Sequence, residues 1–325
     1  MMTSLPAPSS PVFIADLSAR EKIRVSGKDR TTVLHRLLSQ EIRTIKPGGW
    51  NYSSLLNARG KVLSLMTLLA FEDFYWLDVD PGCAEKTITA LNRLIITEDT
   101  SLTLEGGFSH FLLAGSGAAA AIEKILSTRI PESAPFHYTK VQFQSQTFFL
   151  ICKGSQIFEI IFPSALQSFF KEKIIAAGAA DADSSVYEAF RIEHGILRYG
   201  QDVTEDVTLP ETGLDATASS DKKGCYPGQE VVARTNTYKG HTKKMRGLIL
   251  ASAQMPLPGT KFFSGETEAG WITSACFSEH WRKVLALAYL NKGFFDVPCE
   301  TEFTFNGVKI PVQITGLPFR ENPTA

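Results

Sequence analysis

The sequence contains no apolar run near the roughly 20 residues that span a bilayer. Its first eleven residues are rich in Ser and Pro and contain neither the basic segment nor the apolar segment of a secretory signal. We therefore expect a loose tail at 1–11, no membrane association and a cytoplasmic location.

Cysteine is scarce, with five in 325 residues and no C-x-x-C pair. An odd number of widely spaced cysteines argues against a disulfide framework and against a self-contained zinc or cluster site. None of the six histidines has metal-ligand spacing with a cysteine or another histidine, so we expect no intrinsic metal site. The cysteines are Cys83, Cys152, Cys225, Cys276 and Cys299.

A strong charge imbalance is also missing, because 33 Lys and Arg nearly balance 34 Asp and Glu. Overall composition therefore argues against direct nucleic-acid binding. Hydrophobic residues at 44% and charged residues at 21% are typical of a globular protein, and the length suggests two or three domains.

Hydrophobic patterns predict a mixture of strands and helices up to about residue 180. Asp29 is the expected N-cap of the first helix. Other helices are predicted at 83–94, after Gly117 and after Pro163, and a linker at 178–185. Strands are predicted at 22–26, 50–56, 62–71, 74–79, 108–114 and 147–152.

From residue 244 onward, short apolar runs alternate with turns, which is typical of a small β-barrel. The runs cover 245–251, 269–274, 284–290 and 308–314.

Residues 222–234, K-K-G-C-Y-P-G-Q-E-V-V-A-R, place one cysteine between two glycines within a cluster of charge. Gly224 and Gly228 permit close backbone approaches, and Pro227 can open a short helix. Cys225 would then lie beside a helix N-terminus and basic residues, which favour a reactive thiolate. A buried structural cysteine in a tight turn is the alternative.

A helix predicted at 185–195 places Glu193 on the same face as three apolar residues. A carboxylate on such a face needs partners. A structural ion pair with Arg191 or Arg198 would provide them, and so would the hydrogen-bond donors of a ligand. The apolar residues are Val186, Ala189 and Phe190.

The K-G-C-Y-x-G-Q-E pattern followed by a small residue and Arg resembles the YgfZ-like folate-binding proteins. These are relatives of the glycine cleavage T-protein that support iron–sulfur cluster assembly or repair. The segments that resemble the T-protein superfamily elsewhere are 25–27, 55–62, 191–195 and 270–319.

The resemblance implies a three-domain α+β assembly with a folate site at its centre. The implied parts are a discontinuous folate-binding domain at 12–100 and 184–242, a ferredoxin-like α+β middle domain at 101–183, and a C-terminal β-barrel domain at 243–325.

Tetrahydrofolate or another folate is the cofactor that the resemblance implies. Relatives use the Glu of R-x-E-x-G to bind the pterin ring, which points to Glu193, and Tyr187 matches an aromatic that could stack on the pterin or simply pack. Cys225 is the implied functional residue. The other implied folate contacts are Lys223, Gly224, Tyr226, Gly228, Gln229, Glu230 and Arg234.

The segment 222–246 contains seven Lys or Arg, together with His241. This local positive charge could receive the glutamate tail of a folate or the phosphates of RNA. A solvated loop surface is the alternative.

Active T-proteins resemble G-G-V-I-D-D-L where this chain has G-K-V-L-S-L-M at 60–66. One of those aspartates is needed for aminomethyl transfer, whereas this chain has Ser64 and Leu65 there. Neither side chain can replace a carboxylate near neutral pH. This difference weakens the aminomethyltransferase interpretation.

We therefore expect a folate-binding accessory protein for iron–sulfur proteins or their assembly factors, with tRNA modification affected through them. Cys225 could ligate a cluster transiently, accept a thiol-reactive group or carry a one-carbon unit. A tetrahydrofolate-dependent aminomethyl- or methyltransferase and an RNA-binding helper in tRNA modification are the alternatives.

Overall fold

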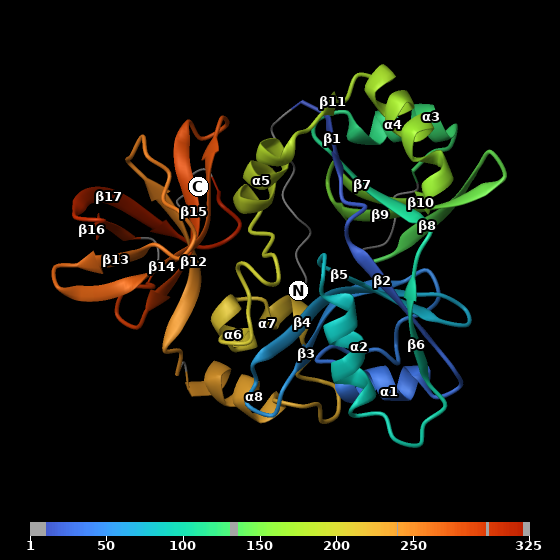
Figure 1. The fold of residues 1–325 in the computed structure, drawn as a ribbon, viewed down its shortest axis with the longest axis horizontal. Coiled ribbons are helices and arrows are strands. Elements are labelled where there is room, and N and C mark those ends of the chain that lie inside the picture. The colour runs from blue at the N-terminus through green and yellow to red at the C-terminus, as the bar shows by residue number, and fades with distance from the viewer. Residues whose placement is uncertain (1–10, 131–135, 239, 297–298, 321–325) are drawn as a thin grey trace. The chain divides into compact units, whose positions relative to one another are not determined.

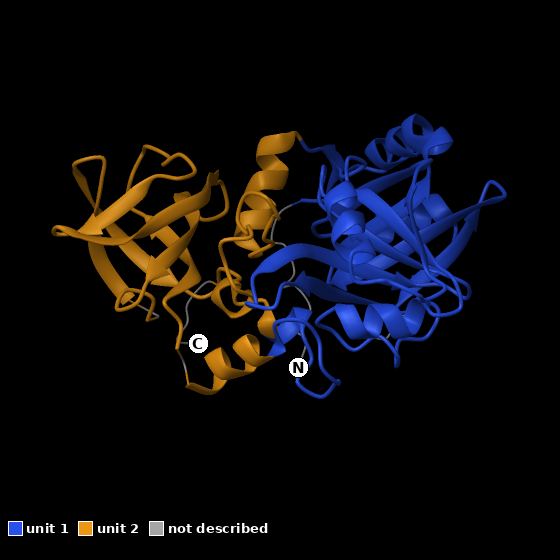
Figure 2. Ribbon diagram, turned by 60° about the horizontal axis from the view of Figure 1, so that its bottom comes forward, with its two compact units in different colours: residues 1–182, 216–229 blue, residues 183–215, 230–325 orange. Residues whose placement is uncertain are grey.

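The computed structural model describes residues 11–130, 136–238, 240–296 and 299–320, so the predicted tail lies outside it except for Pro11. The chain forms two compact units (Figure 2). One comprises residues 1–182 and 216–229, and the other comprises 183–215 and 230–325. No helix in the described ranges is both long enough and apolar enough to cross a membrane.

One antiparallel sheet of the first unit has the strand order β3-β4-β5-β2-β6 (Figure 1). Helices α1 (Arg30–Leu37) and α2 (Ala84–Asn92) share its apolar core. Asp29 precedes α1 as predicted, but its carboxylate accepts the N–H of Asp99 at 2.8 Å and caps no helix amide. The strands are β2 (Glu21–Ser26), β3 (Trp50–Leu56), β4 (Val62–Ala70), β5 (Tyr75–Val79) and β6 (Ser101–Glu105).

The second sheet of this unit has the order β11-β1-β7-β10-β9-β8. Its N-terminal strand runs antiparallel to β7 and parallel to β11. Helices α3 (Ala118–Leu126) and α4 (Gln167–Ala176), the latter preceded by the 3-10 turn η1 (Ser164–Leu166), pack in its core. The strands are β1 (Phe13–Asp16), β7 (Phe108–Ala114), β8 (Tyr138–Phe143), β9 (Gln146–Gly154), β10 (Ile157–Pro163) and β11 (Ala180–Asp181).

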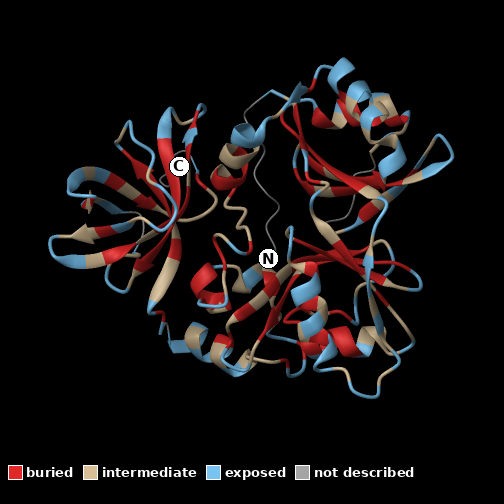
Figure 3. Ribbon diagram, in the orientation of Figure 1, coloured by how far each residue is buried: buried red, intermediate tan, exposed pale blue. Residues whose placement is uncertain are grey.

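The two sheets of the first unit share a buried aromatic layer. Trp50 and Trp76 come from the first sheet, and Tyr138 and Phe149 come from the second. Figure 3 shows the strands as largely buried, while the helices keep one exposed face. This layering follows from strands with apolar side chains on both faces.

Six strands of the C-terminal part form a closed barrel in the order β12-β15-β14-β13-β16-β17. Closure depends on antiparallel pairing of β12 with both β15 and β17, and of β13 with both β14 and β16. The predicted α+β fold with a terminal barrel is confirmed. The strands are β12 (Lys243–Leu250), β13 (Lys261–Ser264), β14 (Thr267–Ser278), β15 (Lys283–Asn291), β16 (Cys299–Phe305) and β17 (Val308–Thr315).

Between the second sheet and the barrel, the described residues of the chain form four helices. The helix predicted at 185–195 is confirmed, with its N-cap at Asp183, whose carboxylate accepts the N–H groups of Ser185 and Val186. The helices are α5 (Ser184–Glu193), α6 (Leu209–Thr212), α7 (Asp215–Ala218) and α8 (Gln229–Tyr238).

Candidate functional site

Lys223 anchors the loop that carries Cys225. Its side chain is buried, and its ammonium donates hydrogen bonds to the carbonyls of His35 and Leu38 and to that of Gln40 at 3.1 Å. These carbonyls lie at or just beyond the C-terminal end of α1, where peptide oxygens lack helical partners and favour a cation. Burial lowers the pKa of Lys223 to about 8. The predicted folate contact therefore has its donors engaged within the first unit.

Gly228 fixes the other end of the loop. Its φ is +79°, and a Cβ there would lie 2.6 Å from the carbonyl oxygen of Asn57 and 2.8 Å from the Cα of Gly60. A side chain is therefore excluded by this unit's own backbone. Gly224 differs, because a Cβ there would meet nothing within 4 Å. A side chain would therefore clash at Gly228 but not at Gly224.

Cys225 lies exposed between these two anchors, with the side chain of Tyr226 buried next to it. The alternative of a buried structural cysteine is therefore wrong. Helix α8 begins at Gln229, so Cys225 precedes it by four residues and Pro227 lies outside its first turn. Because helix-terminus effects decline within one turn, proximity to the helix contributes less than the sequence suggested.

The other cysteines differ in exposure. Cys83 and Cys152 are half-buried, and Cys299 is exposed. Burial raises the pKa of Cys83, and it raises that of the buried Cys276 to about 12. No group of three or more His, Cys, Asp or Glu side chains within the described ranges is placed to hold a metal ion.

Helix α8 carries three of the remaining predicted contacts. Gln229 is half-buried, whereas Glu230 and Arg234 are exposed. The backbone N–H of Gln229 donates to the carbonyl of Tyr226 at 3.2 Å, which continues the loop into the helix.

Glu193 is the last residue of α5, and its half-buried carboxylate accepts a hydrogen bond from the Ser278 hydroxyl at 2.5 Å. The predicted apolar face is only partly buried, because Val186 is 44% exposed. Tyr187 is half-buried on the same helix. The six residues from Tyr187 to Glu193 correspond to about 600° of helical rotation, which is about 120° short of two full turns. The two side chains therefore point in directions about 120° apart around the helix axis.

The predicted alternative of an ion pair between Glu193 and Arg191 or Arg198 is wrong, because both arginines pair with Glu188. Arg191 Nε lies 2.7 Å from Glu188 Oε2, and Arg198 Nη2 lies 3.0 Å from the same oxygen. Arg191 Nη1 also donates to the fully buried Asp202 at 2.7 Å. Burial opposes the charge of Arg191, but Glu188 and Asp202 raise its pKa.

Ser64 and Leu65 lie on opposite faces of β4. Ser64 is buried, with its hydroxyl 2.8 Å from that of Thr87 in α2, and Leu65 is half-buried. The strand therefore presents a satisfied hydroxyl and an alkyl group at the two positions where active T-proteins resemble Asp-Asp.

The cations of the basic segment 222–246 differ in exposure. Lys223 is internal, Lys222 and Arg234 are exposed, and Lys239 lies outside the described residues. The remaining cations are on β12, where Lys244 and Arg246 are separated by one residue and share a face.

A cluster of ionisable side chains in the first unit escaped the sequence analysis. Burial alone would raise the pKa of Asp78, but Arg20, Lys22 and His110 hold it well below its usual range. Glu159 lies 3.3 Å from the buried Lys153. One sequence feature could have indicated this cluster, namely a single ionisable residue inside an apolar strand, such as His110 in F-S-H-F-L-L.

These features define an α+β protein with a closed terminal barrel and an exposed thiol on an anchored loop. Residues 7–222 match the family model for the GCVT N-terminal domain, and residues 243–320 match that for the glycine cleavage T-protein C-terminal barrel domain. Because the first match covers more than half of the chain, the protein belongs to the glycine cleavage T-protein family.

Several relatives align over almost the whole chain. The mitochondrial aminomethyltransferase of Dictyostelium discoideum is 23% identical over 333 residues, covering 94% of this chain and 81% of that protein. The aminomethyltransferase of Listeria innocua is 25% identical over 309 residues, covering 94% and 85%. The crystal structure of glycine cleavage system aminomethyltransferase T from Bartonella henselae has a TM-score of 0.84 at 21% identity, covering 95% of this chain and 86% of that one. This structural likeness establishes the fold.

Proposed function

We propose that this T-protein family member binds tetrahydrofolate or a related folate and supports the assembly or repair of iron–sulfur proteins through Cys225, with tRNA modification affected through such clients. The observation that carries the proposal is the exposed thiol between two fixed points. Lys223 and Gly228 hold the loop, and neither contact uses the sulfur.

A thiolate is a ligand that iron–sulfur clusters use, but one thiolate cannot hold a cluster alone. Cys225 would therefore act with ligands from a client protein, an assembly factor or a small thiol. An exposed position suits such a shared role, because the partner must reach the sulfur. We expect the partners to be iron–sulfur proteins or cluster assembly factors.

We infer that residues of α5 contact the folate. An ionised carboxylate offers about four lone-pair positions, and the Ser278 hydroxyl takes one of those on Glu193. The positions left suit the N–H edge of a pterin, and Tyr187 would add an aromatic surface. A bound tetrahydrofolate would supply a carrier for one-carbon units.

Calorimetry with tetrahydrofolate tests the folate assignment. Replacing Glu193→Ala should weaken binding by about 1–3 kcal/mol, the range for losing a charged hydrogen-bond partner. Glu279→Ala is the matched control, because Glu279 is an exposed carboxylate next to Ser278. Equal affinity of wild type and Glu193→Ala would remove Glu193 from the site.

Complementation of cells that lack the protein tests the role of the thiol. Cys225→Ser should fail to restore the activity of cluster-dependent enzymes, because a hydroxyl is a poor ligand for soft metals. Cys299→Ser controls for loss of an exposed cysteine and should complement fully. Full complementation by Cys225→Ser would end the proposal.

Aminomethyl transfer is the second candidate, because the relatives above are named aminomethyltransferases. Against it, β4 carries Ser64 and Leu65, neither of which ionises near neutral pH. We expect no turnover with an aminomethyl donor and tetrahydrofolate. A rate comparable to that of an authentic T-protein would establish this candidate and displace the accessory role.

A further inference from the structure

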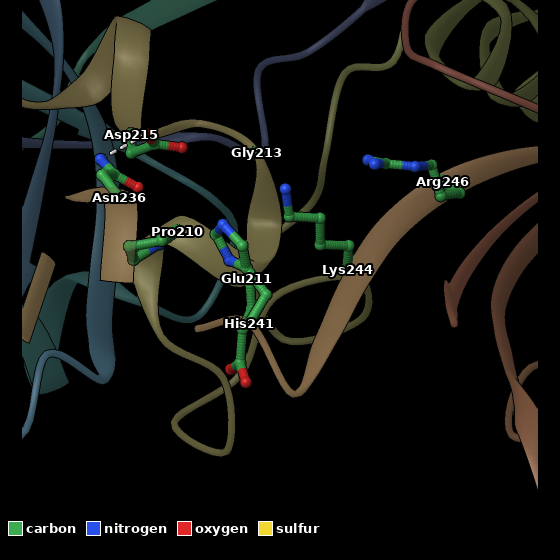
Figure 4. A pocket seen from close by; sticks show the side chains of 8 residues that line it. All are labelled: Pro210, Glu211, Gly213, Asp215, Asn236, His241, Lys244 and Arg246. Atoms are coloured by element: carbon green, nitrogen blue, oxygen red, sulfur yellow. Dashed lines mark hydrogen bonds between the residues drawn. The ribbon is translucent and has the colours of Figure 1, made fainter. Parts of the chain in front are cut away.

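A pocket of about 160 Å³ lies within the second unit (Figure 4). For comparison, an engineered cavity of about 150 Å³ accepts a benzene molecule. A phosphate or a carboxylate group is smaller than benzene and would fit. The lining residues are Pro210, Glu211, Gly213, Asp215, Asn236, His241, Lys244 and Arg246.

Both carboxylates of the pocket have protein partners. Glu211 accepts the N–H of Thr208 at 2.8 Å and the Thr242 hydroxyl at 2.9 Å, and it completes the capping box of α6. Figure 4 shows its carboxylate pointing away from the Lys244 ammonium. Asp215 accepts a hydrogen bond from the Asn236 amide at 2.9 Å. Neither carboxylate therefore needs a bound cation.

His241 provides the main indication of a ligand. Its side chain is only 7% exposed, and its Nδ1 has no hydrogen-bond partner among the described residues. Leaving a buried polar nitrogen unsatisfied costs free energy, so such an atom in a native structure points to a missing partner. The ring lines the pocket.

Two cations stand on the same side of β12 as the pocket. Lys244 and Arg246 project together from that strand in Figure 4. Arg246 donates Nε to the carbonyl of Phe295 at 2.7 Å and Nη1 to that of Met245 at 3.0 Å. Its Nη2 makes no hydrogen bond within the described part of the chain, so the N–H groups of that nitrogen remain for a ligand.

We propose that His241, Lys244 and Arg246 form a binding site for a small oxyanion, either a carboxylate or a phosphate group. Lys244 supplies a point charge, Arg246 a directed N–H and His241 a ring N–H. The two cations compensate the charge of the anion in a partly desolvated pocket. Cys225, Glu193 and the residues of β4 are not among those that line the pocket.

The state of His241 agrees with this assignment. Burial lowers the pKa of His241, and Lys244 and Arg246 lower it further, while Asp215 and Glu211 oppose them. The ring is therefore neutral near neutral pH. A bound anion would stabilise the imidazolium, so the pKa of His241 should rise on binding.

Calorimetry on the full chain with inorganic phosphate and, separately, with glutarate tests the proposal. At least one anion should bind saturably, and Lys244→Gln should weaken it by about tenfold or more, the effect of losing one charged hydrogen bond. Lys243→Gln is the matched control, because Lys243 is not among the residues that line the pocket and its ammonium lies over the ring of Trp271, 5.0 Å from the centroid. It should leave affinity unchanged.

The two anions also distinguish the ligand source. Phosphate alone indicates a phosphorylated ligand, glutarate alone a carboxylate tail, and both indicate a general oxyanion site. Ring NMR signals of His241 should report the rise in its pKa with whichever anion binds. Failure of both anions to saturate, or equal weakening by Lys243→Gln and Lys244→Gln, would overturn the proposal.

Discussion

Lys223 and Arg191 are both buried cations that hold a candidate functional segment, but their partners differ. Lys223 holds the Cys225 loop through neutral carbonyls, whereas Arg191 holds α5 through the carboxylates of Glu188 and Asp202. Carbonyls only partly replace water for an ammonium, and burial lowers its pKa to about 8. Burial also disfavours the charged form of Arg191, but the two carboxylates more than offset this effect, and the pKa of Arg191 rises. The loop anchor therefore responds to alkaline pH, and the helix anchor does not.

Removing the helix anchor should have the largest effect on stability. Arg191→Met leaves the fully buried Asp202 without its cation, which costs about 3–5 kcal/mol. Denaturant unfolding of the purified chain measures this loss. Arg198→Met is the control, because Arg198 is 36% exposed and should cost about 1 kcal/mol or less. Equal effects of the two changes would show that burial of the ion pair does not matter.

The loop anchor should give a smaller, pH-dependent effect. The pKa of Lys223 is about 8 in the folded chain and close to 10.5 in the unfolded chain. Between these values the unfolded chain binds more protons, so the free energy of unfolding rises with pH, by about 3 kcal/mol at most. Lys223→Met should lack this rise between pH 8 and 10.5.

Parallel pH profiles for wild type and Lys223→Met would contradict this prediction. They would mean that the three carbonyls keep the ammonium charged. The contrast with Arg191 would then disappear, since both anchors would be permanent cations in this range.

Changing Gly228, the second anchor of the Cys225 loop, should reduce stability by less than the two changes above. Gly228→Ala forces a side chain into a positive φ and against the backbone of Asn57, which we expect to destabilise the first unit by about 2 kcal/mol. Gly224→Ala should change stability by less than about 0.5 kcal/mol, because its Cβ enters open space. Thermal unfolding of both variants measures the difference. A larger loss for Gly224→Ala would invalidate the account of the two glycines.

Local sequence signals located many of the elements, although they missed β8 and β10, and they did not identify the contacts that hold the elements together. The glycines around Cys225 indicated a special loop, yet Lys223 bonds to Leu38, 185 positions earlier, and no local pattern encodes that separation. Likewise, alternation predicted the β12 and β17 segments, while closure depends on pairing such as Leu248 with Ile314.

Helical periodicity placed Glu193 correctly in its helix but not its partner. The spacing could not decide between Arg191 and Arg198, because the competing carboxylate, Glu188, lies on the same helix and reaches both. Burial was also misjudged at Val186, since periodicity indicates which residues share a face but not whether another element covers it.

Cys225, which the two anchors hold in place, should contribute least to stability. Cys225 is an exposed free cysteine, so Cys225→Ser should change the free energy of unfolding by less than about 0.5 kcal/mol. Cys276→Ser is the contrast, because a hydroxyl buried there in place of a thiol should cost about 1–3 kcal/mol. Thermal unfolding measures both changes.

Alkylation provides a second measurement on the same thiols. Cys225 should react well before Cys276, because burial raises the pKa of Cys276 to about 12 and leaves almost no thiolate near neutral pH. Peptide mapping after brief treatment with iodoacetamide would rank the cysteines. A marked loss of stability in Cys225→Ser, or slow alkylation of Cys225, would show that this sulfur is packed within the loop. Cys225 would then stabilise the loop as Lys223 and Gly228 do, and the proposed difference between them would be wrong.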